Sequence, residues 1–288
     1  MKRIVSAVLT AVAALTALVV VQGCGVLGGP PTGVAVSAGP GDSDSTVVIS
    51  WTTPAEGAPD KYMVYFRPVT DSGYTVIGET TATSYVHNPH GVTGMYKVVA
   101  LFGQDTYAGA EKPTTVPVAS GSVTLFEINA DSSQCAYGWS RDSGIGKTYS
   151  MTNGANCAHV DFYVSDLQAG VGGELKVVSP NKAHPDSGAS IDTGAVGIVP
   201  QAAWRVNGFT NPLPDAQSPV PGYQSPPNAN YFIYTQVTTQ PCYIGCYTAG
   251  DTVKHYALVQ VDNVNVASGQ VWLKTWYQLV PGLRLMRH

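Results

Sequence analysis

Short runs in which apolar and polar residues alternate recur along this chain, separated by turn-forming residues. In residues 46–51, for example, Val47, Ile49 and Trp51 fall on one side of an extended backbone. Runs of this length, repeated about every eight to twelve residues, are typical of a β-sandwich. From residue 122 onward no segment shows sustained helical periodicity. The sequence therefore predicts an all-β protein.

The composition favours the same fold class. Charged residues make up only 12% of the 288 residues, whereas glycine (31), proline (20) and tyrosine (16) are abundant. Few charges and many turn formers suit sheets with loops at both ends, and a hydrophobic content of 44% is enough to build cores. The net charge of −4 gives no basic footprint, which argues against nucleic acid as a partner.

The first 24 residues have the layout of an export signal. A basic start is followed by an apolar, uncharged run over residues 4–21, and Gly23 precedes Cys24. This pattern resembles a bacterial lipoprotein signal, which implies that Cys24 is lipidated and becomes the mature N-terminus. The alternative is an uncleaved membrane span, since the run is at the short end of what crosses a bilayer. In both cases we expect residues 25–288 outside the cytoplasm, held at the cell envelope or cell surface.

Four cysteines remain after Cys24, and an even number in an oxidising compartment predicts two disulfides. Three pairings are possible, and proximity in the sequence favours Cys135 with Cys157 and Cys242 with Cys246. The second pair would close a tight loop. A zinc site is the alternative, but the spacings lack the paired short knuckles that such sites use.

Residues 25–118 carry a pattern that resembles the fibronectin type III domain. It comprises Pro31 at the start, Trp51 in the second strand, Tyr62 or Tyr65 in the third, and Tyr96 in a Tyr-Lys-Val-Val-Ala strand. The resemblance implies a β-sandwich that acts as a spacer or adhesive module without catalysis. It also implies that Tyr96 is a tyrosine-corner residue, whose hydroxyl bonds the backbone a few residues upstream.

The loop over residues 87–91 departs from that family, which usually has a leucine-proline turn here. The loop contains a His-x-x-His pair, His87 and His90. As metal ligands these histidines would need a helix or a third donor nearby, and Pro89 is incompatible with a helix. We therefore expect two solvated loop histidines.

Residues 119–121 are predicted to be a linker, and residues 122–288 a second, larger domain of β-sandwich or jelly-roll type. The last apolar run, residues 270–280, is largely apolar on both faces, which predicts a central strand that is covered twice. His159 and Asp161 alternate with apolar residues. A sheet edge or an inter-strand hydrogen bond explains them as well as catalytic chemistry does.

Three aromatic residues are candidate ligand-binding residues in the second domain. Tyr223 lies in a long proline-rich loop, and loops of that length inside a domain are usually functional or disordered. Trp139 and Trp204 occur in Gly/Ser/Asn-rich surroundings and could join Tyr223 in a platform for a sugar or peptide. The alternative for such residues is the domain core, where they lie more often.

The C-terminal residues carry a second resemblance. Residues 254–261, 268–271 and 276–278 are similar to the closing strands of the HmuY-like haem-binding lipoproteins. That resemblance implies haem held by two histidines. His159, His184 and His255 are available, but none matches a ligand position of the family, so we expect no cofactor.

Motifs for hydrolysis are missing from the sequence, which has no Gly-x-Ser-x-Gly and no His-Glu-x-x-His. Glu127 and Glu174 are the only glutamates of the second domain, and both flank apolar runs, which favours structural roles over the paired carboxylates of a glycosidase. We therefore expect a non-enzymatic, lipid-anchored envelope protein that binds a surface protein or polysaccharide or acts as a scaffold. Capture of haem or a glycan is the alternative, and a glycan-degrading enzyme is the third possibility.

Overall fold

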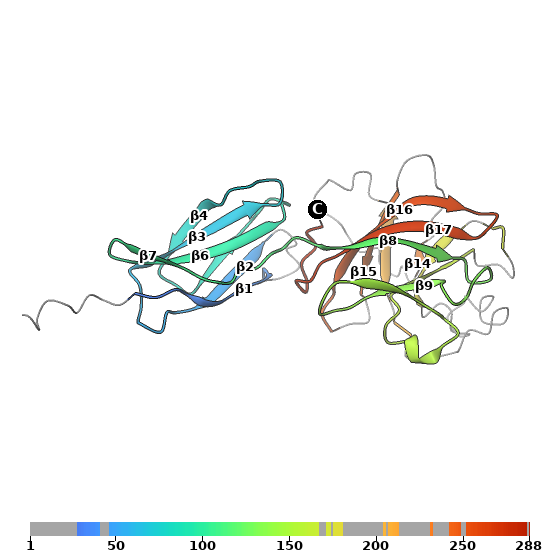
Figure 1. Ribbon diagram of the computed structural model, residues 1–288, viewed down its shortest axis with the longest axis horizontal. Helices are drawn as coiled ribbons and strands as arrows, with labels where there is room; N and C mark the ends of the chain where they lie inside the picture. Colours follow the sequence, from blue (N-terminus) through green and yellow to red (C-terminus); the bar gives the residue numbers. More distant parts are fainter. Residues whose placement is uncertain are drawn as a thin grey trace, which may run out of the picture.

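The computed structural model describes residues 28–40, 46–166, 171–173, 175–180, 204–205, 207–212, 231–232, 242–248, 252–286 and 288. Its named strands form antiparallel sheets in two domains that follow one another along the long axis of the molecule (Figure 1). Strands β1–β7 build the first domain and β8–β17 the second. The all-β prediction is confirmed. None of the described helical segments has the length and apolar character needed to cross a membrane.

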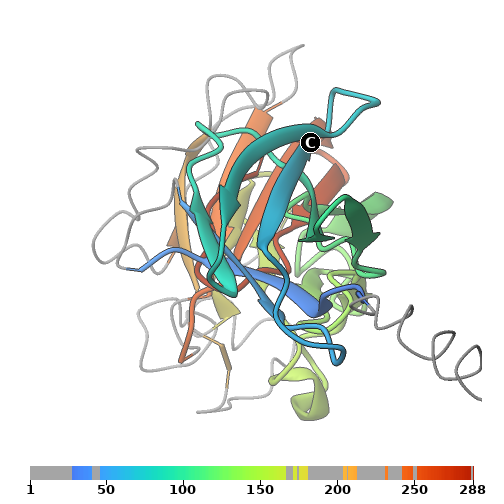
Figure 2. The same ribbon diagram turned by 90° about the vertical axis from the view of Figure 1, so that its left-hand side faces the viewer.

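The first domain is a fibronectin type III-like sandwich of a three-stranded and a four-stranded sheet. The three-stranded sheet has the order β1-β2-β5, made by Thr32–Ala38, Val47–Thr52 and Ser84–His87. The four-stranded sheet has the order β4-β3-β6-β7, made by Thr75–Thr80, Lys61–Pro68, Gly94–Phe102 and Asp105–Ala108. Figure 2 shows these sheets end-on, in front of the second domain.

Alternation along the strands builds the core of this sandwich. Val47 and Ile49 of β2 are completely buried, and Trp51 packs edge-to-face on Tyr62 of β3, with ring centroids 5.1 Å apart. Such an edge-to-face pair stabilises a core by about 0.5–1.5 kcal/mol beyond the area it buries. The apolar face predicted for residues 46–51 is therefore the face that packs between the two sheets.

Tyr96 is fully buried, but its hydroxyl does not make the expected bond to the upstream backbone. It lies 3.0 Å from Nδ1 of His87, whose ring also packs on Phe66 at a centroid distance of 5.0 Å. The expectation of two solvated histidines is thus wrong for His87, which is half-buried, whereas His90 is exposed. Burial, and secondly the neighbouring charge of His90, lower the pKa of His87 to about 4.

The second domain contains two five-stranded antiparallel sheets, with the orders β10-β9-β11-β12-β14 and β13-β15-β16-β17-β8. The strands of the first sheet are β9 (Ala136–Trp139), β10 (Gly146–Tyr149), β11 (Phe162–Ser165), β12 (Lys176–Val178) and β14 (Tyr231–Phe232). The strands of the second sheet are β8 (Val118–Phe126), β13 (Gly208–Pro212), β15 (Cys242–Tyr247), β16 (Tyr256–Asn265) and β17 (Gln270–Tyr277). A short 3-10 helix, Gly154–Asn156, lies between β10 and β11.

Two sequence expectations about this domain are corrected. Residues 119–121 are not a linker, because they belong to β8 and pair with β17, where Ala119 lies opposite Trp276. Strand β17 does lie between two strands, β16 and β8, as predicted. However, only one of its faces, which includes Leu273 and Tyr277, is fully buried, and Trp276 on the other face is half-exposed.

The C-terminal segment leaves the second domain and packs into the first. Val280, Leu283 and Leu285 are buried in the same apolar cluster as the sandwich core. Figure 1 shows the C-terminus at the junction of the two domains. Residues 280–285, which the sequence assigned to the second domain, therefore complete the core of the first.

Candidate functional site

A buried carboxylate in the second domain joins strands β9 and β11. Asp161 directly precedes β11, and its main-chain N–H donates to the carbonyl oxygen of Tyr137 in β9 at 2.8 Å. Asp161 Oδ2 in turn accepts the main-chain N–H of Trp139 at 2.9 Å, at the point where β9 ends. The side chain of Asp161 thus extends the hydrogen bonding between β9 and β11. This agrees with the inter-strand hydrogen bond that was one of the roles expected for Asp161 from the sequence.

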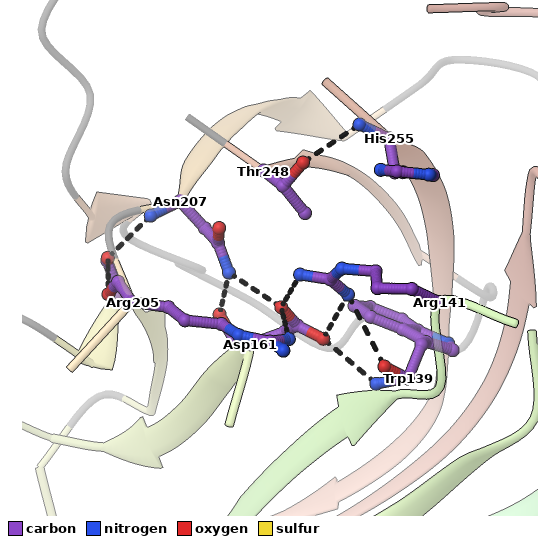
Figure 3. A network of polar contacts seen from close by, with 8 residues as sticks. Trp139, Arg141, Asp161, Arg205, Asn207, Thr248 and His255 are labelled. Carbon is purple, nitrogen blue, oxygen red and sulfur yellow. Dashed lines mark hydrogen bonds and ion pairs between the residues drawn. The ribbon is translucent and has the colours of Figure 1, made fainter. Parts of the chain in front are cut away.

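Two arginines from distant parts of the chain converge on this carboxylate (Figure 3). Arg141 binds it in a bidentate manner, with Nη1 2.9 Å from Oδ2 and Nη2 2.8 Å from Oδ1. Arg205 Nη1 lies 2.9 Å from Oδ1. Asn207 Nδ2 donates to Oδ1 at 3.1 Å and to the main-chain oxygen of Asp161 at 2.7 Å. We call Asp161, Arg141, Arg205 and Asn207 the arginine cluster.

These contacts stabilise the ionised form of Asp161. Burial alone raises the pKa of this carboxyl, but the hydrogen bonds and charge of Arg141, the charge of Arg205 and the N–H of Trp139 outweigh it, so the pKa lies below its usual 3.8. Both carboxylate oxygens already accept at least two hydrogen bonds. Asp161 is thus a fixed anion that positions guanidinium groups, and its geometry does not suit a general acid or base.

Aromatic rings line the Arg141 side of the cluster. The guanidinium carbon of Arg141 lies 5.7 Å from the ring centroid of Tyr277, in the range of a cation–π contact. Trp139 and His255 each stack on the same ring, with centroids 5.7 Å from it. His255 is held by Thr248, whose Oγ1 accepts the main-chain N–H of His255 at 2.8 Å. Figure 3 shows Thr248 and His255 beside the arginine cluster.

The aromatic platform predicted for ligand binding is not formed by its tryptophans. Trp139 and Trp204 are each 3% exposed and lie in apolar clusters of the second domain. Trp139 Nε1 donates to Oγ1 of Thr275 at 3.1 Å, so the polar end of its ring is also used internally. Buried rings cannot stack on a sugar or peptide, and the core alternative is the correct one. Tyr223 lies outside the described residues, as does Cys24.

The expected disulfides do not agree with the structure. Cys135 and Cys157 are free thiols, and Cys135 Sγ donates to the main-chain oxygen of Ser132 at 3.3 Å. Burial raises the pKa of the Cys135 thiol to about 12. Cys242 and Cys246 belong to one continuous strand, β15, rather than to a tight loop. Four residues of extended chain span about 13 Å, whereas the Cα atoms of a disulfide lie at most about 7 Å apart.

Two other titratable residues named from the sequence, Glu127 and His159, contact residues that do not belong to the arginine cluster. Glu127 is fully buried and accepts the main-chain N–H groups of Asn129 and Ala130 at 2.7 and 3.1 Å. Burial raises its pKa to about 7. His159 is exposed and stacks on Tyr149, with ring centroids 6.0 Å apart. Glu174 and His184 are not described.

Within the part of the chain that the structure describes, no three His, Cys, Asp or Glu side chains are placed to hold a metal ion. The alternation of polar and apolar residues in the sequence pointed to Asp161, but no pattern pointed to Arg141, Arg205 or Asn207. A useful signal was available, because the chain has few charged residues and two of its arginines follow a tryptophan closely, in Trp139-Ser140-Arg141 and Trp204-Arg205. A cation so close to a core residue is a candidate partner for a buried carboxylate.

No protein-family model matches the chain, and no curated protein matches it. Among solved structures, the chain is similar to an FN3 domain of human collagen XX, with 22% identity over 31% of this chain and 92% of that chain and a TM-score of 0.26. A mutant of FN3tt matches with 21% identity over 30% of this chain and 91% of that chain, at a TM-score of 0.25. A DUF4466 family protein from Parabacteroides merdae matches with 10% identity over 81% of this chain and 91% of that chain, at a TM-score of 0.35.

Proposed function

We propose that this protein is a non-enzymatic lipoprotein of the cell envelope, in which the first domain is a stiff spacer that presents the second domain to a surface protein or polysaccharide. The observation that carries the proposal is the packing of Val280, Leu283 and Leu285 into the core of the first domain. In this arrangement a segment of the second domain completes the core of the first domain. Such packing is expected of a stiff spacer and not of a flexible tether.

Two stretches of chain cross between the domains, and a buried glutamine joins them. Residues 109–117 lead from β7 to β8, and residues 278–285 return from β17. Gln278 is fully buried, and its Nε2 donates to the main-chain oxygens of Thr115 and Leu285, both at 2.8 Å. Domains joined by one exposed linker normally move relative to each other. Two crossings with a shared apolar core resist bending.

The start of the described chain supports this arrangement. Gly28 lies against Phe102 and Tyr107 of the β6–β7 hairpin, at the end of the first domain that is farther from the second domain (Figure 1). An acylated Cys24 four residues earlier would therefore place the first domain between the membrane and the second domain. Each buried methylene of a lipid contributes about 0.8 kcal/mol, and a lasting anchor takes more than one acyl chain.

Metabolic labelling with a radioactive fatty acid tests the anchor. We expect the wild-type chain to be labelled and found in the membrane fraction, with its bulk accessible to protease on intact or outer-membrane-permeabilised cells. Cys24→Ala should abolish the label, whereas the matched variant Cys157→Ala should keep it. An unacylated chain that retains Met1 and remains in the cytosol would refute the proposal.

A further inference from the structure

We propose that the outer face of the four-stranded sheet in the first domain binds a polysaccharide built from uronic acids, whose sugar units carry carboxylate groups. The face is formed by Tyr65 and Arg67 of β3, Lys97 of β6, and Tyr74, which directly precedes β4. We call these four residues the cation–tyrosine face. Such binding goes beyond the function proposed above, which gives the first domain only a spacer role, and it does not depend on membrane anchoring.

Alternation along the strands turns these side chains away from the core of the sandwich. Val64 and Phe66 of β3 are buried between the two sheets, so Tyr65 and Arg67 point to the opposite face, where they are partly exposed. Lys97 of β6 is also partly exposed and lies directly opposite Tyr65 in the register of the two strands. Figure 1 shows β3 and β6 next to each other, with β1 and β2 on the other side of the sandwich. The cation–tyrosine face is therefore a surface feature of the first domain.

Two cations share one tyrosine ring on this face. The guanidinium carbon of Arg67 lies 5.3 Å from the ring centroid of Tyr74, and Nζ of Lys97 lies 5.0 Å from the same centroid. Lys97 Nζ also lies 4.3 Å from the ring centroid of Tyr65. These are cation–π contacts, and they hold two flexible cationic side chains close together before any ligand arrives. A pre-arranged pair of this kind lowers the entropy cost of binding.

The positive charges of the face are not neutralised within the described chain. Among the described residues, Lys61 and Glu79 form the ion pair of this sheet, with Nζ and Oε2 2.7 Å apart, and no carboxylate pairs with Arg67 or Lys97. Arg67 Nη2 donates instead to the sulfur of Met95, which is a weak and uncharged acceptor. The chain as a whole has a net charge of −4, so this positive patch is a local feature that is complementary to an anionic ligand.

The place of the face in the sheet favours a polysaccharide over an acidic peptide. An extended peptide typically binds at the edge of a sheet, where main-chain N–H and C=O groups are open to it. Strand β3 pairs with β4 on one side and β6 on the other, so the main chain of Tyr65 and Arg67 is already paired. The face offers guanidinium and ammonium groups beside tyrosine rings. A uronic acid unit presents a carboxylate, hydroxyl groups and an apolar ring face close together, and these match a cation and a tyrosine.

Calorimetric titration of the full chain at constant ionic strength tests the face, with polygalacturonate as the anionic probe and dextran as the neutral one. We expect saturable binding of polygalacturonate and no binding of dextran. Arg67→Gln and Lys97→Gln should each weaken binding about tenfold or more, whereas Lys97→Arg, which keeps the charge, should bind like the wild-type chain. Lys147→Gln is the matched control, because it removes a lysine that also lies over a tyrosine ring, 5.0 Å from the centroid of Tyr149, but in the second domain. Its binding should be unchanged.

Tyr74→Leu separates a built face from general attraction between charges. It removes the ring that the two cations share but no charge, and Tyr74 is partly exposed and precedes its strand, so the fold should be retained. We expect binding about threefold weaker than in the wild-type chain, and thermal melting checks that each variant is folded. The proposal is overturned if polygalacturonate does not bind the wild-type chain, if dextran or poly-L-glutamate binds as tightly, or if the Arg67→Gln, Lys97→Gln and Tyr74→Leu variants bind like wild type.

Discussion

The side-chain amide of Gln278 donates a hydrogen bond of 2.8 Å to the main-chain oxygen of Thr115, and the two residues are 163 positions apart in the chain. A second bond of the same length runs from this amide to Leu285, and Gln278 Oε1 accepts the main-chain N–H of Val280 at 3.1 Å. The side chain of one fully buried residue, Gln278, therefore connects residues 109–117, which lead into the second domain, to the C-terminal segment that returns to the first.

Gln278→Ala should destabilise the protein by about 2–4 kcal/mol, because it leaves the buried oxygens of Thr115 and Leu285 without their donor. Urea unfolding followed by circular dichroism measures the loss. Gln270→Ala, at the start of β17 on its half-exposed face, should cost less than about 0.5 kcal/mol. Equal effects of the two variants would show that the amide does not tie the domains together.

Leu283→Ala should destabilise the first domain although residue 283 is remote from it in sequence. Removal of a fully buried leucine typically costs about 2–5 kcal/mol. Hydrogen exchange of β2 and β6 amides, measured by NMR, reports on that domain directly, and we expect faster exchange there. Val266→Ala is the control, since Val266 is 41% exposed. Unchanged exchange in β2 and β6 would rule out a shared core.

His87 should make the protein less stable as the pH falls from 6.5 to about 4. Its pKa is lowered from 6.5 to about 4 in the folded chain, so in this window the unfolded chain binds the proton more readily. The stabilisation is complete above pH 6.5 and is lost as the pH falls towards about 4. Thermal melts across this range should show a smaller decline for His87→Gln than for wild type. His159→Gln, which changes an exposed histidine, should follow the wild-type curve.

Asp161→Asn should be among the most damaging single substitutions in the second domain. It leaves two guanidinium groups beside a buried amide, and removal of one partner from a buried ion pair costs about 3–5 kcal/mol. Asp262→Asn removes a carboxylate from the exposed pair with Lys274 and should cost about 0–1 kcal/mol. Chemical denaturation of wild type, Asp161→Asn and Asp262→Asn compares their free energies of unfolding. A mild effect of Asp161→Asn would mean that charge does not hold the arginine cluster together.

The Asp161 carboxylate also predicts that the second domain loses stability at low pH. The folded pKa of Asp161 is below its ordinary 3.8, so the stabilisation is present above pH 3.8 and is lost as the pH falls through the lower folded value. In acid titrations that follow the fluorescence of the buried tryptophans, wild type should lose this contribution below pH 3.8. Asp161→Asn should lack that step, and a step of equal size in both proteins would contradict the assignment.

Several parts of the fold could be predicted from local sequence. Val47, Ile49 and Trp51 alternate, and they are the residues that β2 buries. The pairing of β17 with strands on both sides also follows from its apolar run, since a central strand needs apolar residues to pack. By contrast, Cys242 and Cys246 were expected in a tight loop, and the structure places them in one extended strand. Proximity in sequence did not reveal that strand pairing would keep the two residues apart.

The sequence by itself determined the all-β architecture and the type III-like first domain, because a strand's alternation and its turns are local properties of the chain. Only the tertiary structure decided which polar groups meet. Arg205 reaches Asp161 across 44 positions, and Gln278 reaches Thr115 across 163. Such pairs depend on strand order and register, which bring distant side chains within the roughly 3 Å of a hydrogen bond and leave no mark in the local sequence.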